Sequence, residues 1–402
     1  MPEQKASAPV ATLARVGLTE DAVKAHVLTP DLAGATSFHG PDNAAATLKI
    51  PTPLPRHTYT FDGSAFCTQL HEDLKSSVAG YIMRMRQNGQ QIYDLTWNWA
   101  EEPQDGSEGW EPYVRMHVAS CSKLVTAIAM TKLFDERSIS FTTKIIDYLP
   151  AYWSKGPGVD QVTFANLLTQ RSGFNFGNNE TGSDYAFMKQ QVASGTTHAG
   201  TYNYQNMNFG LCRILLSTVN GNIPTGSNFG LVNDPVWDLI TTQCYVAYVT
   251  ANVFGPGRVS DGSLAHIAGD ALAYNFPVSG NGWSSGDLTA YAGGAAWHLS
   301  VNDLLGIMGA FRRQNTIVSQ AQAQSMLDAG YGLDLTQSTP LGTMYAKNGG
   351  WSSSNSQTEQ CVAFFLPQGI ELVVFVNSPI GSSNPPQFLM GTVAQYYIEN
   401  TK

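Results

Sequence analysis

The chain has 402 residues, a formal net charge of −9 at pH 7 and a pI of about 5.3. This acidic balance argues against nucleic acids and anionic membranes as partners, because both carry negative charge, and no apolar run approaches the length of a membrane span. Hydrophobic residues make up 43% of the chain and charged residues only 13%, so the composition predicts a globular protein with a sizeable core and many polar loops.

The start of the chain is rich in alanine, proline and threonine. We expect residues 1–58 to form an N-terminal extension that wraps the body of the protein, with a short capped helix within residues 18–27. The first residues contain no apolar segment of the kind found in secretory signals. The sequence therefore indicates either a cytoplasmic protein or a mature form from which a signal has been removed.

Strand patterns occur near both ends of the body. Residues 81–97 predict a hairpin, because Asn88-Gly89 separates two strand-like runs. Two further strands are predicted at 360–366 and 370–376, and a closing helix at 388–400. The long middle of the chain reads as helices and loops without clear strands. One sheet would therefore be built from both ends of the chain.

A serine precedes a lysine by three residues at one place in the chain, Ser120-Cys-Ser-Lys123. The apolar residues that follow recur at helical spacing, so Ser120 is predicted at the first turn of a buried helix, with Lys123 beside its hydroxyl. A serine hydroxyl is a good nucleophile only when a neighbouring base takes its proton. A lysine can be that base when burial or another cation lowers its pKa.

Two further motifs follow in a fixed order, Tyr204-Gln-Asn206 and Lys347-Asn-Gly-Gly350. The series S-x-x-K, Y-x-N, K-x-G resembles the serine β-lactamase and penicillin-binding-protein superfamily. The likeness is closest to class C-like enzymes and family VIII carboxylesterases, and it covers about residues 60 to 400. Flanking segments that are also similar to the family lie at 133–150, 162–174, 206–211, 293–305 and 330–334.

The resemblance implies an α/β (α+β) fold, in which an antiparallel β-sheet flanked by helices carries an inserted, mostly helical domain. The α/β domain would comprise residues 59–145 and 290–402, and the helical domain residues 146–289. The catalytic cleft would lie between the two domains, where ligand sites commonly form.

The resemblance also implies roles for the motif residues. Ser120 would attack an acyl carbonyl and hold the acyl group covalently, while Lys123 accepts or relays its proton. Tyr204 is a second candidate base, because a phenol between two lysines has a lowered pKa. Asn206 would hydrogen-bond Lys123 or a substrate amide.

The third motif would complete the site. Lys347 would supply positive potential for Tyr204 and bind a substrate carboxylate. The backbone N–H groups of Ser120 and Gly350 would form the oxyanion hole, and glycine at 349 and 350 leaves room for a ligand to approach the backbone. We expect the substrate to contact Asn206, Lys347, Asn348, Gly349 and Trp351. Tryptophans that are candidates for lining an apolar acyl pocket are Trp153, Trp283, Trp297 and Trp351.

Two departures from the β-lactamase pattern bear on the activity. Asn348 stands where β-lactamases and transpeptidases have a hydroxyl residue that helps to bind the ligand carboxylate. No glutamate-containing loop of the class A type occurs between the first two motifs, so Tyr204 would have to activate the deacylating water. Both departures favour an esterase or acyltransferase over a dedicated β-lactamase.

We therefore expect a cofactor-free serine esterase that hydrolyses small carboxylic esters through an acyl-enzyme, with weak β-lactam turnover. The alternatives are an acyltransferase, an amidase or D-aminopeptidase, or a β-lactamase of the same fold. An alternative of another class is a scaffold that only binds acyl or peptide ligands. The expected partner is a small-molecule ester or amide, and the oligomeric state stays open.

Neither the cysteines nor the histidines form a metal-ligand motif in the sequence, and no metal is expected. The five cysteines suggest free buried thiols rather than a disulfide framework. Cys121 would pack behind the nucleophile, because consecutive helical residues face different directions. For His117 we expect a strand or core role.

Overall fold

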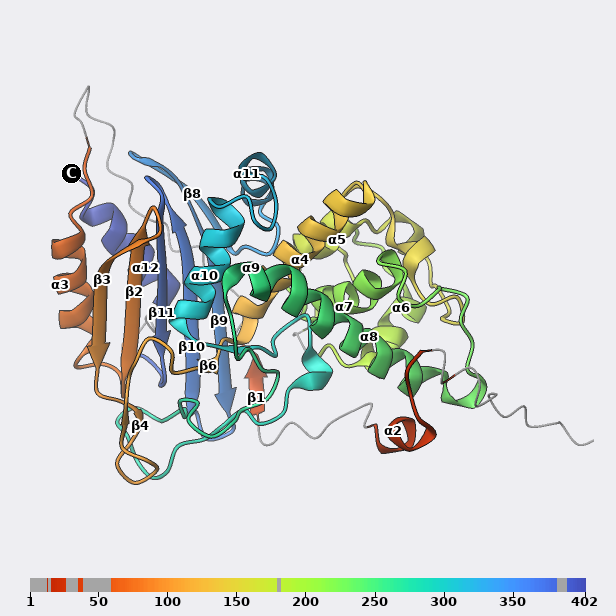
Figure 1. Ribbon diagram of the computed structural model, residues 1–402, viewed down its shortest axis with the longest axis horizontal. Helices are drawn as coiled ribbons and strands as arrows, with labels where there is room; N and C mark the ends of the chain where they lie inside the picture. The colour runs from red at the N-terminus through yellow and green to blue at the C-terminus, as the bar shows by residue number, and fades with distance from the viewer. Residues whose placement is uncertain (1–12, 14–15, 27–34, 39–58, 179–181, 382–388) are drawn as a thin grey trace, which may run out of the picture. The chain divides into compact units, whose positions relative to one another are not determined.

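The computed structural model describes residues 13, 16–26, 35–38, 59–178, 182–381 and 389–402 (Figure 1). The chain forms two compact units. The larger unit comprises residues 32–125, 253–288 and 295–402, and the smaller unit residues 1–31, 126–252 and 289–294. The first passage of the chain from the larger to the smaller unit occurs within one helix, α4 (Ser122–Arg137).

The domain boundaries that the resemblance implies, after residues 145 and 289, stay a prediction. One division between the compact units falls inside α4, after Val125, and two others fall after Leu288 and Gly294. Residues 253–288 join the larger unit because their backbone bonds to it, for example from Ala271 N–H to the Arg115 carbonyl at 2.7 Å.

The larger unit is built on a seven-stranded antiparallel sheet in the order β1-β9-β10-β11-β2-β3, with β8 also beside β9. This confirms the predicted fold class, because both ends of the body contribute to one sheet. The strands are β1 (Ala35–Phe38), β2 (Tyr81–Gln87), β3 (Gln90–Trp97), β8 (Leu335–Thr339), β9 (Gly342–Ser353), β10 (Thr358–Leu366) and β11 (Ile370–Val376).

Local turn and cap chemistry explains the elements that the sequence predicted. Asn88 and Gly89 have φ of 50° and 85°, the left-handed values that a two-residue hairpin turn requires. Thr19 caps the short helix α2 (Glu20–Ala25) by accepting the Ala22 N–H at 3.1 Å. The closing helix α12 spans Leu389–Glu399; Phe388 lies outside the described residues. The predicted late strands are β10, which begins two residues earlier at Thr358, and β11.

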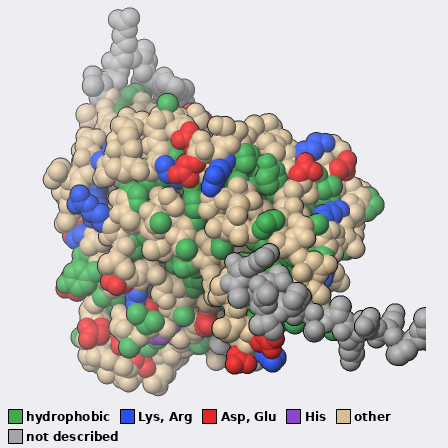
Figure 2. All heavy atoms as spheres, turned by 45° about the vertical axis from the view of Figure 1, so that its right-hand side comes forward, with side chains coloured by type: hydrophobic (Ala, Val, Ile, Leu, Met, Phe, Trp, Pro, Cys, Tyr) green, Lys and Arg blue, Asp and Glu red, His purple; other side chains and the backbone are tan. Residues whose placement is uncertain are grey.

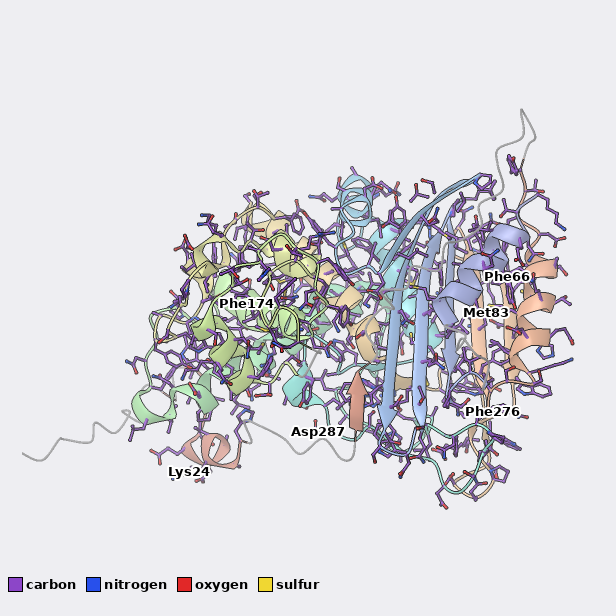
Figure 3. The ribbon with its side chains drawn as sticks, turned by 180° about the vertical axis from the view of Figure 1, so that it is seen from behind. Lys24, Phe66, Met83, Phe174, Phe276 and Asp287 are labelled. Carbon is purple, nitrogen blue, oxygen red and sulfur yellow. The ribbon has the colours of Figure 1, made fainter. Side chains whose placement is uncertain are left out.

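Alternate residues of the strands point to opposite faces of the sheet. One face packs against α3 (Gly63–Leu74) and α12, and its buried core includes Phe66 and Met83, labelled in Figure 3. The opposite face carries α10 (Val301–Arg312), where the ring of Phe311 lies 6.2 Å from that of Phe365. Ser300 is the N-cap of α10 and forms a reciprocal pair of capping hydrogen bonds with Asp303.

The third motif lies at a gap between strand partners. On one edge of β9, strand β8 pairs with Gly342–Ala346, and β1 pairs with Trp351–Ser353. Among the described strands, the same edge has no partner strand alongside residues 347–350. The N-terminal extension thus contributes β1 to the sheet, which the sequence did not predict, and this strand borders the motif.

The remaining elements of the larger unit are short. They are β4 (Trp99–Glu101), β5 (Glu108–Gly109), β6 (Met116–His117), η1 (Ala119–Cys121), α9 (Gly255–Gly257), β7 (His298–Leu299) and α11 (Gln320–Asp328). The chain leading out of β6 enters η1 and then α4, so this short strand sets the position of the predicted nucleophile.

The smaller unit is helical in its described part, as expected for the middle of the chain. Its helices beyond α2 and α4 are α5 (Phe164–Leu168), α6 (Tyr185–Ser194), α7 (Met207–Val219) and α8 (Asn233–Val249). Asp238 of α8 is 1% exposed, and it forms an ion pair with Arg213 of α7 at 2.7 Å and a contact with His26 Nε2 at 2.8 Å. This buried charge cluster ties the N-terminal helix region to α7 and α8.

No described helix combines the length and apolar character that crossing a bilayer requires. On the face drawn in Figure 2, charged side chains stand in small groups of both signs among uncharged atoms. This distribution agrees with the low content of charged residues.

Candidate active site

The predicted nucleophile, Ser120, follows a strained turn of the backbone. Strand β6 pairs with β7, His117 opposite His298, and the Val118 N–H donates to the Trp297 carbonyl at 2.9 Å. Ala119 then adopts a φ of +46°, a left-handed conformation that costs a residue with a side chain about 1–3 kcal/mol. The strained residue is therefore the one immediately before Ser120. The hydrogen bonds around it keep it in this conformation.

The structure brings Ser120 and Lys123 together. The Lys123 Nζ donates to the Ser120 Oγ at 2.8 Å. The Lys123 side chain is fully buried, whereas Ser120 in the 3₁₀ turn η1 keeps 5% of its surface exposed. The two groups thus lie at the distance that a nucleophile and its base require, while the role of Lys123 as a base stays a prediction.

Strand β9 lies directly against this turn at Gly349. A Cβ atom added there would come within 2.3 Å of the Val118 carbonyl oxygen and 3.2 Å of the Ser120 nitrogen. Only glycine allows that approach. The next residue, Gly350, lies on the same strand; the use of its N–H group and that of Ser120 as oxyanion donors stays a prediction.

Lys347 has an acidic partner that the sequence reasoning missed. Its Nζ lies 2.5 Å from Asp334 Oδ2, and the two side chains are 1% and 3% exposed. The same carboxylate oxygen accepts the Asn348 N–H at 3.0 Å. Asp334 ends the Gly330–Asp334 segment that resembles the family, so the signal was present, but no role had been given to the carboxylate. The positive charge of Lys347 is therefore balanced by this ion pair.

Two residues that were predicted to contact the substrate, Asn348 and Trp351, have half-buried and fully buried side chains. Asn348 alternates with Gly349 along β9, so its half-buried side chain lies on the opposite face of the strand, across from Val362. Trp351 is 1% exposed, and its ring lies 5.2 Å from that of His117. Contact of either residue with the substrate stays a prediction.

His117, which lies shortly before the turn that carries Ser120, is buried among polar groups. His117 Nδ1 lies 2.8 Å from Glu359 Oε2, and its Nε2 faces the Ala295 carbonyl. Both ring nitrogens can donate to these acceptors only if the imidazole carries both protons. Burial, together with the nearby His117 and His266, lowers the pKa of His298 well below its ordinary value. His117 and His298 lie opposite each other in the β6–β7 pair, which leads into η1, and both are buried. This agrees with the core role expected for His117.

All five cysteines are free thiols, as expected. The Cys121 Sγ donates to the Lys347 and Cys361 carbonyls at 3.4 and 3.5 Å, so Cys121 packs between the nucleophile turn and the sheet. Burial raises the pKa of the Cys361 thiol well above its ordinary value. A thiol with a raised pKa stays protonated and is a poor nucleophile.

The second motif, Tyr204-Gln205-Asn206, belongs to the smaller unit and precedes α7. Gln170 clamps this segment, because its side-chain carbonyl accepts the Gln205 N–H at 3.1 Å and the Asn208 amide at 2.5 Å. Tyr204 is half-buried and Asn206 fully buried. The clamp fixes the backbone around Tyr204, whereas the approach of Tyr204 and Asn206 to Ser120 stays a prediction.

Comparison with known proteins places the chain in a family. A model of the family described as Beta-lactamase matches residues 68–387. The chain belongs to the beta-lactamase family. Members of this family are mostly serine hydrolases. No curated protein sequence matches the chain.

Solved structures share the fold at low sequence identity. A β-lactamase/D-alanine carboxypeptidase from Yersinia pestis is 15% identical, with a TM-score of 0.60 over 84% of this chain and 99% of that one. A D-stereospecific amidohydrolase from Streptomyces sp. is 19% identical, with a TM-score of 0.55 over 79% and 94%. A penicillin-binding protein from Bacillus halodurans is 20% identical, with a TM-score of 0.58 over 81% and 98%. At these identities the likeness shows the fold alone.

The close approach at Gly349 leads to a prediction. Gly349→Ala should lower kcat/KM at least ~10²-fold, because displacement of a reacting group by about an ångström has that effect. The matched control is Gly391→Ala in α12, where an added Cβ meets no atom within 4 Å. Ester turnover and melting temperature are measured for both variants. Wild-type turnover in Gly349→Ala would show that β9 does not constrain the Ser120 turn.

Proposed function

We propose that this chain is a serine hydrolase that cleaves small carboxylic esters through an acyl-enzyme, without a cofactor. The observation that supports it most is the buried 2.8 Å hydrogen bond between Lys123 Nζ and Ser120 Oγ, in a family whose members are mostly serine hydrolases. The partner would be a small-molecule ester.

The proposed reaction has two halves. Ser120 Oγ attacks the ester carbonyl carbon while its proton passes to the Lys123 amine, and the alcohol leaves with a proton, so that an ester bond to Ser120 remains. Water then attacks this acyl-enzyme, with Tyr204 as the general base, and releases the carboxylic acid and free Ser120. The N–H groups of Ser120 and Gly350 would stabilise the oxyanion in both halves.

The charge around Lys347 favours neutral substrates. β-Lactams carry a carboxylate that a free lysine attracts, but Lys347 is already paired with Asp334 in a buried ion pair. Asn348 also lacks the hydroxyl that would help to bind such a carboxylate. A neutral ester needs neither group, so an esterase fits this arrangement better than a β-lactamase does.

The same site would serve acyl transfer or amide hydrolysis if an alcohol replaced water or an amine replaced the leaving alcohol. A panel of p-nitrophenyl esters, D-amino acid amides and nitrocefin, tested on one purified sample, separates these activities. A stoichiometric label on Ser120 without turnover of any of these substrates would instead support the non-catalytic scaffold.

The first prediction from the proposal concerns the nucleophile. Ser120→Ala should abolish ester turnover and covalent labelling by a fluorophosphonate, while the melting temperature stays near that of the wild type. The matched control is Ser122→Ala. The Ser122 hydroxyl accepts the Trp297 N–H at 3.0 Å and is not the proposed nucleophile, so this variant should still be labelled. Residual turnover in Ser120→Ala above a tenth of the wild-type rate would contradict the assignment.

The second prediction concerns the base. Tyr204→Phe should lower kcat at least ~10²-fold, the usual scale for loss of a general base, with little change in melting temperature. Rates are measured with a p-nitrophenyl ester, and stability is measured by thermal unfolding. A large loss of stability with activity retained would show that Tyr204 is a core residue.

The third prediction concerns selectivity. Loss of one charge-assisted hydrogen bond costs ~1.5–3 kcal/mol, or roughly 10- to 150-fold in kcat/KM. The wild type should therefore hydrolyse a short-chain p-nitrophenyl ester with a kcat/KM well above that for nitrocefin, because Lys347 is already paired with Asp334. Faster hydrolysis of nitrocefin than of every ester by the wild type would replace the esterase proposal with a β-lactamase.

A further inference from the structure

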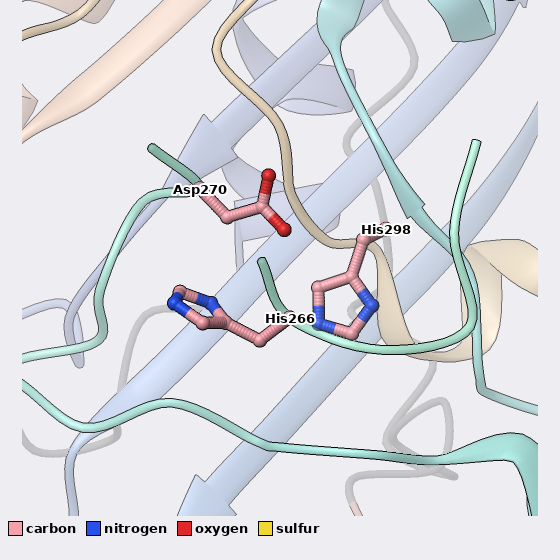
Figure 4. Close-up of side chains that lie close together, drawn as sticks. All are labelled: His266, Asp270 and His298. Atoms are coloured by element: carbon pink, nitrogen blue, oxygen red, sulfur yellow. The ribbon is translucent and has the colours of Figure 1, made fainter. Parts of the chain in front are cut away.

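Three side chains that lie far apart in the sequence meet in the larger unit. His266, Asp270 and His298 each offer one ligand atom, and these atoms all lie within 4.8 Å of one another. Figure 4 shows the three side chains around a common space. His298 and Asp270 are each 1% exposed. No local sequence motif predicts this group, because its members come from two separate segments.

Each oxygen of the Asp270 carboxylate accepts a hydrogen bond from a neighbouring residue. Arg115 Nε donates to Asp270 Oδ1 at 2.8 Å, and the Ile267 N–H donates to Oδ2 at 3.0 Å. Each oxygen keeps a second lone pair for a further partner. Groups bonded to a metal ligand in this way fix its orientation and raise the affinity of a metal site.

The two histidines stand on a backbone that is bonded together. The His266 N–H donates to the Gly286 carbonyl at 3.0 Å, and the His298 N–H donates to the Ser263 carbonyl at 2.7 Å. The hydroxyl of Ser285 lies 3.3 Å from His298 Nε2, which is longer than a strong hydrogen bond. The segments that carry the group are therefore positioned before any ion arrives.

A cavity of about 620 Å³ borders the group at Asp270. Asp270 lines it together with Asp261 and Asp303, and Arg115 is the only cationic side chain in the lining. Three carboxylates against one guanidinium favour the entry of a cation. None of the motif residues from Ser120 to Trp351 lines this cavity, so it is separate from the candidate active site.

We propose that His266, Asp270 and His298 form a binding site for a divalent transition-metal ion of the zinc class. Two imidazoles and one carboxylate are ligands that Zn²⁺ favours over Mg²⁺ or Ca²⁺, which take mainly oxygen ligands. In a tetrahedral zinc site the ligand atoms lie roughly 3.3–3.5 Å apart, so side-chain movements of about an ångström would close the group around the ion. The fourth position would face water or an anionic group in the cavity.

The site would act on the strands that precede the nucleophile. His298 lies opposite His117 in the β6–β7 pair, and the chain continues from His117 into the turn that holds Ser120. A bound ion would link β7 to the 266–270 loop and so stabilise this pair. The inference does not depend on the esterase proposal, because no ester, acyl group or motif residue takes part in it.

Metal binding to the full chain, prepared without a polyhistidine tag and stripped by a chelator, tests the proposal. Zn²⁺ should bind at one equivalent per chain in competition with a chromophoric chelator and raise the melting temperature, whereas Mg²⁺ should do neither. His266→Ala and Asp270→Asn should each raise the zinc Kd at least ~10-fold, since loss of even an outer partner of a ligand costs 10- to 100-fold. Co²⁺ should give the visible absorption bands of a tetrahedral site in the wild type and lose them in His266→Ala.

The matched control is His198→Ala, which removes an exposed histidine of the smaller unit and should leave the zinc Kd unchanged. Equal zinc binding by the wild type, His266→Ala and His198→Ala would show an adventitious surface ion only and overturn the proposal. Absence of one-equivalent binding in the wild type would overturn it as well. His266 is only partly buried, so His266→Ala decides the test even if Asp270→Asn fails to fold.

Discussion

The packing of β9 against the turn before α4 is the constraint on which the candidate site depends. At Gly349 the strand leaves no space for even one carbon atom beside the backbone of Val118 and Ser120. The turn is itself strained at Ala119, and its conformation persists because β7, β9 and the start of α4 enclose it. A Ser120 hydroxyl held in this way cannot move away from Lys123, and this fixed position is what the short bond between them requires.

Two buried lysines in the larger unit have different electrostatic surroundings. Lys347 meets a carboxylate, so a formal positive charge there is compensated within the protein. Lys123 donates to the hydroxyl of Ser120. Under the proposed function, Lys123 would act as a base and Lys347 would contribute charge, although both are lysines buried in one unit.

Local patterns allowed much of the fold and of the site to be predicted. Asn88-Gly89 encodes its hairpin in adjacent residues, and the Ser120–Lys123 contact follows from the spacing of one helical turn. Long-range partners were not predictable in the same way. Asp334 meets Lys347 from the bend that precedes β8, and Gln170 bonds to the Tyr204 segment from another loop. Nothing in the local sequence around Lys347 or Tyr204 names either partner, and the distance from Tyr204 to Ser120 depends on both units.

The strand order has a consequence for synthesis of the chain. Strand β2 lies between β3, which follows it directly, and β11, which is the last strand of the sequence. During translation the β2–β3 hairpin leaves the ribosome first and then waits until nearly the whole chain has been made before its other neighbour appears. Its apolar edge is exposed during this interval, and such edges are sites of wrong pairing between chains. Recombinant yield of the protein should therefore depend on chaperone supply more than its final stability would suggest.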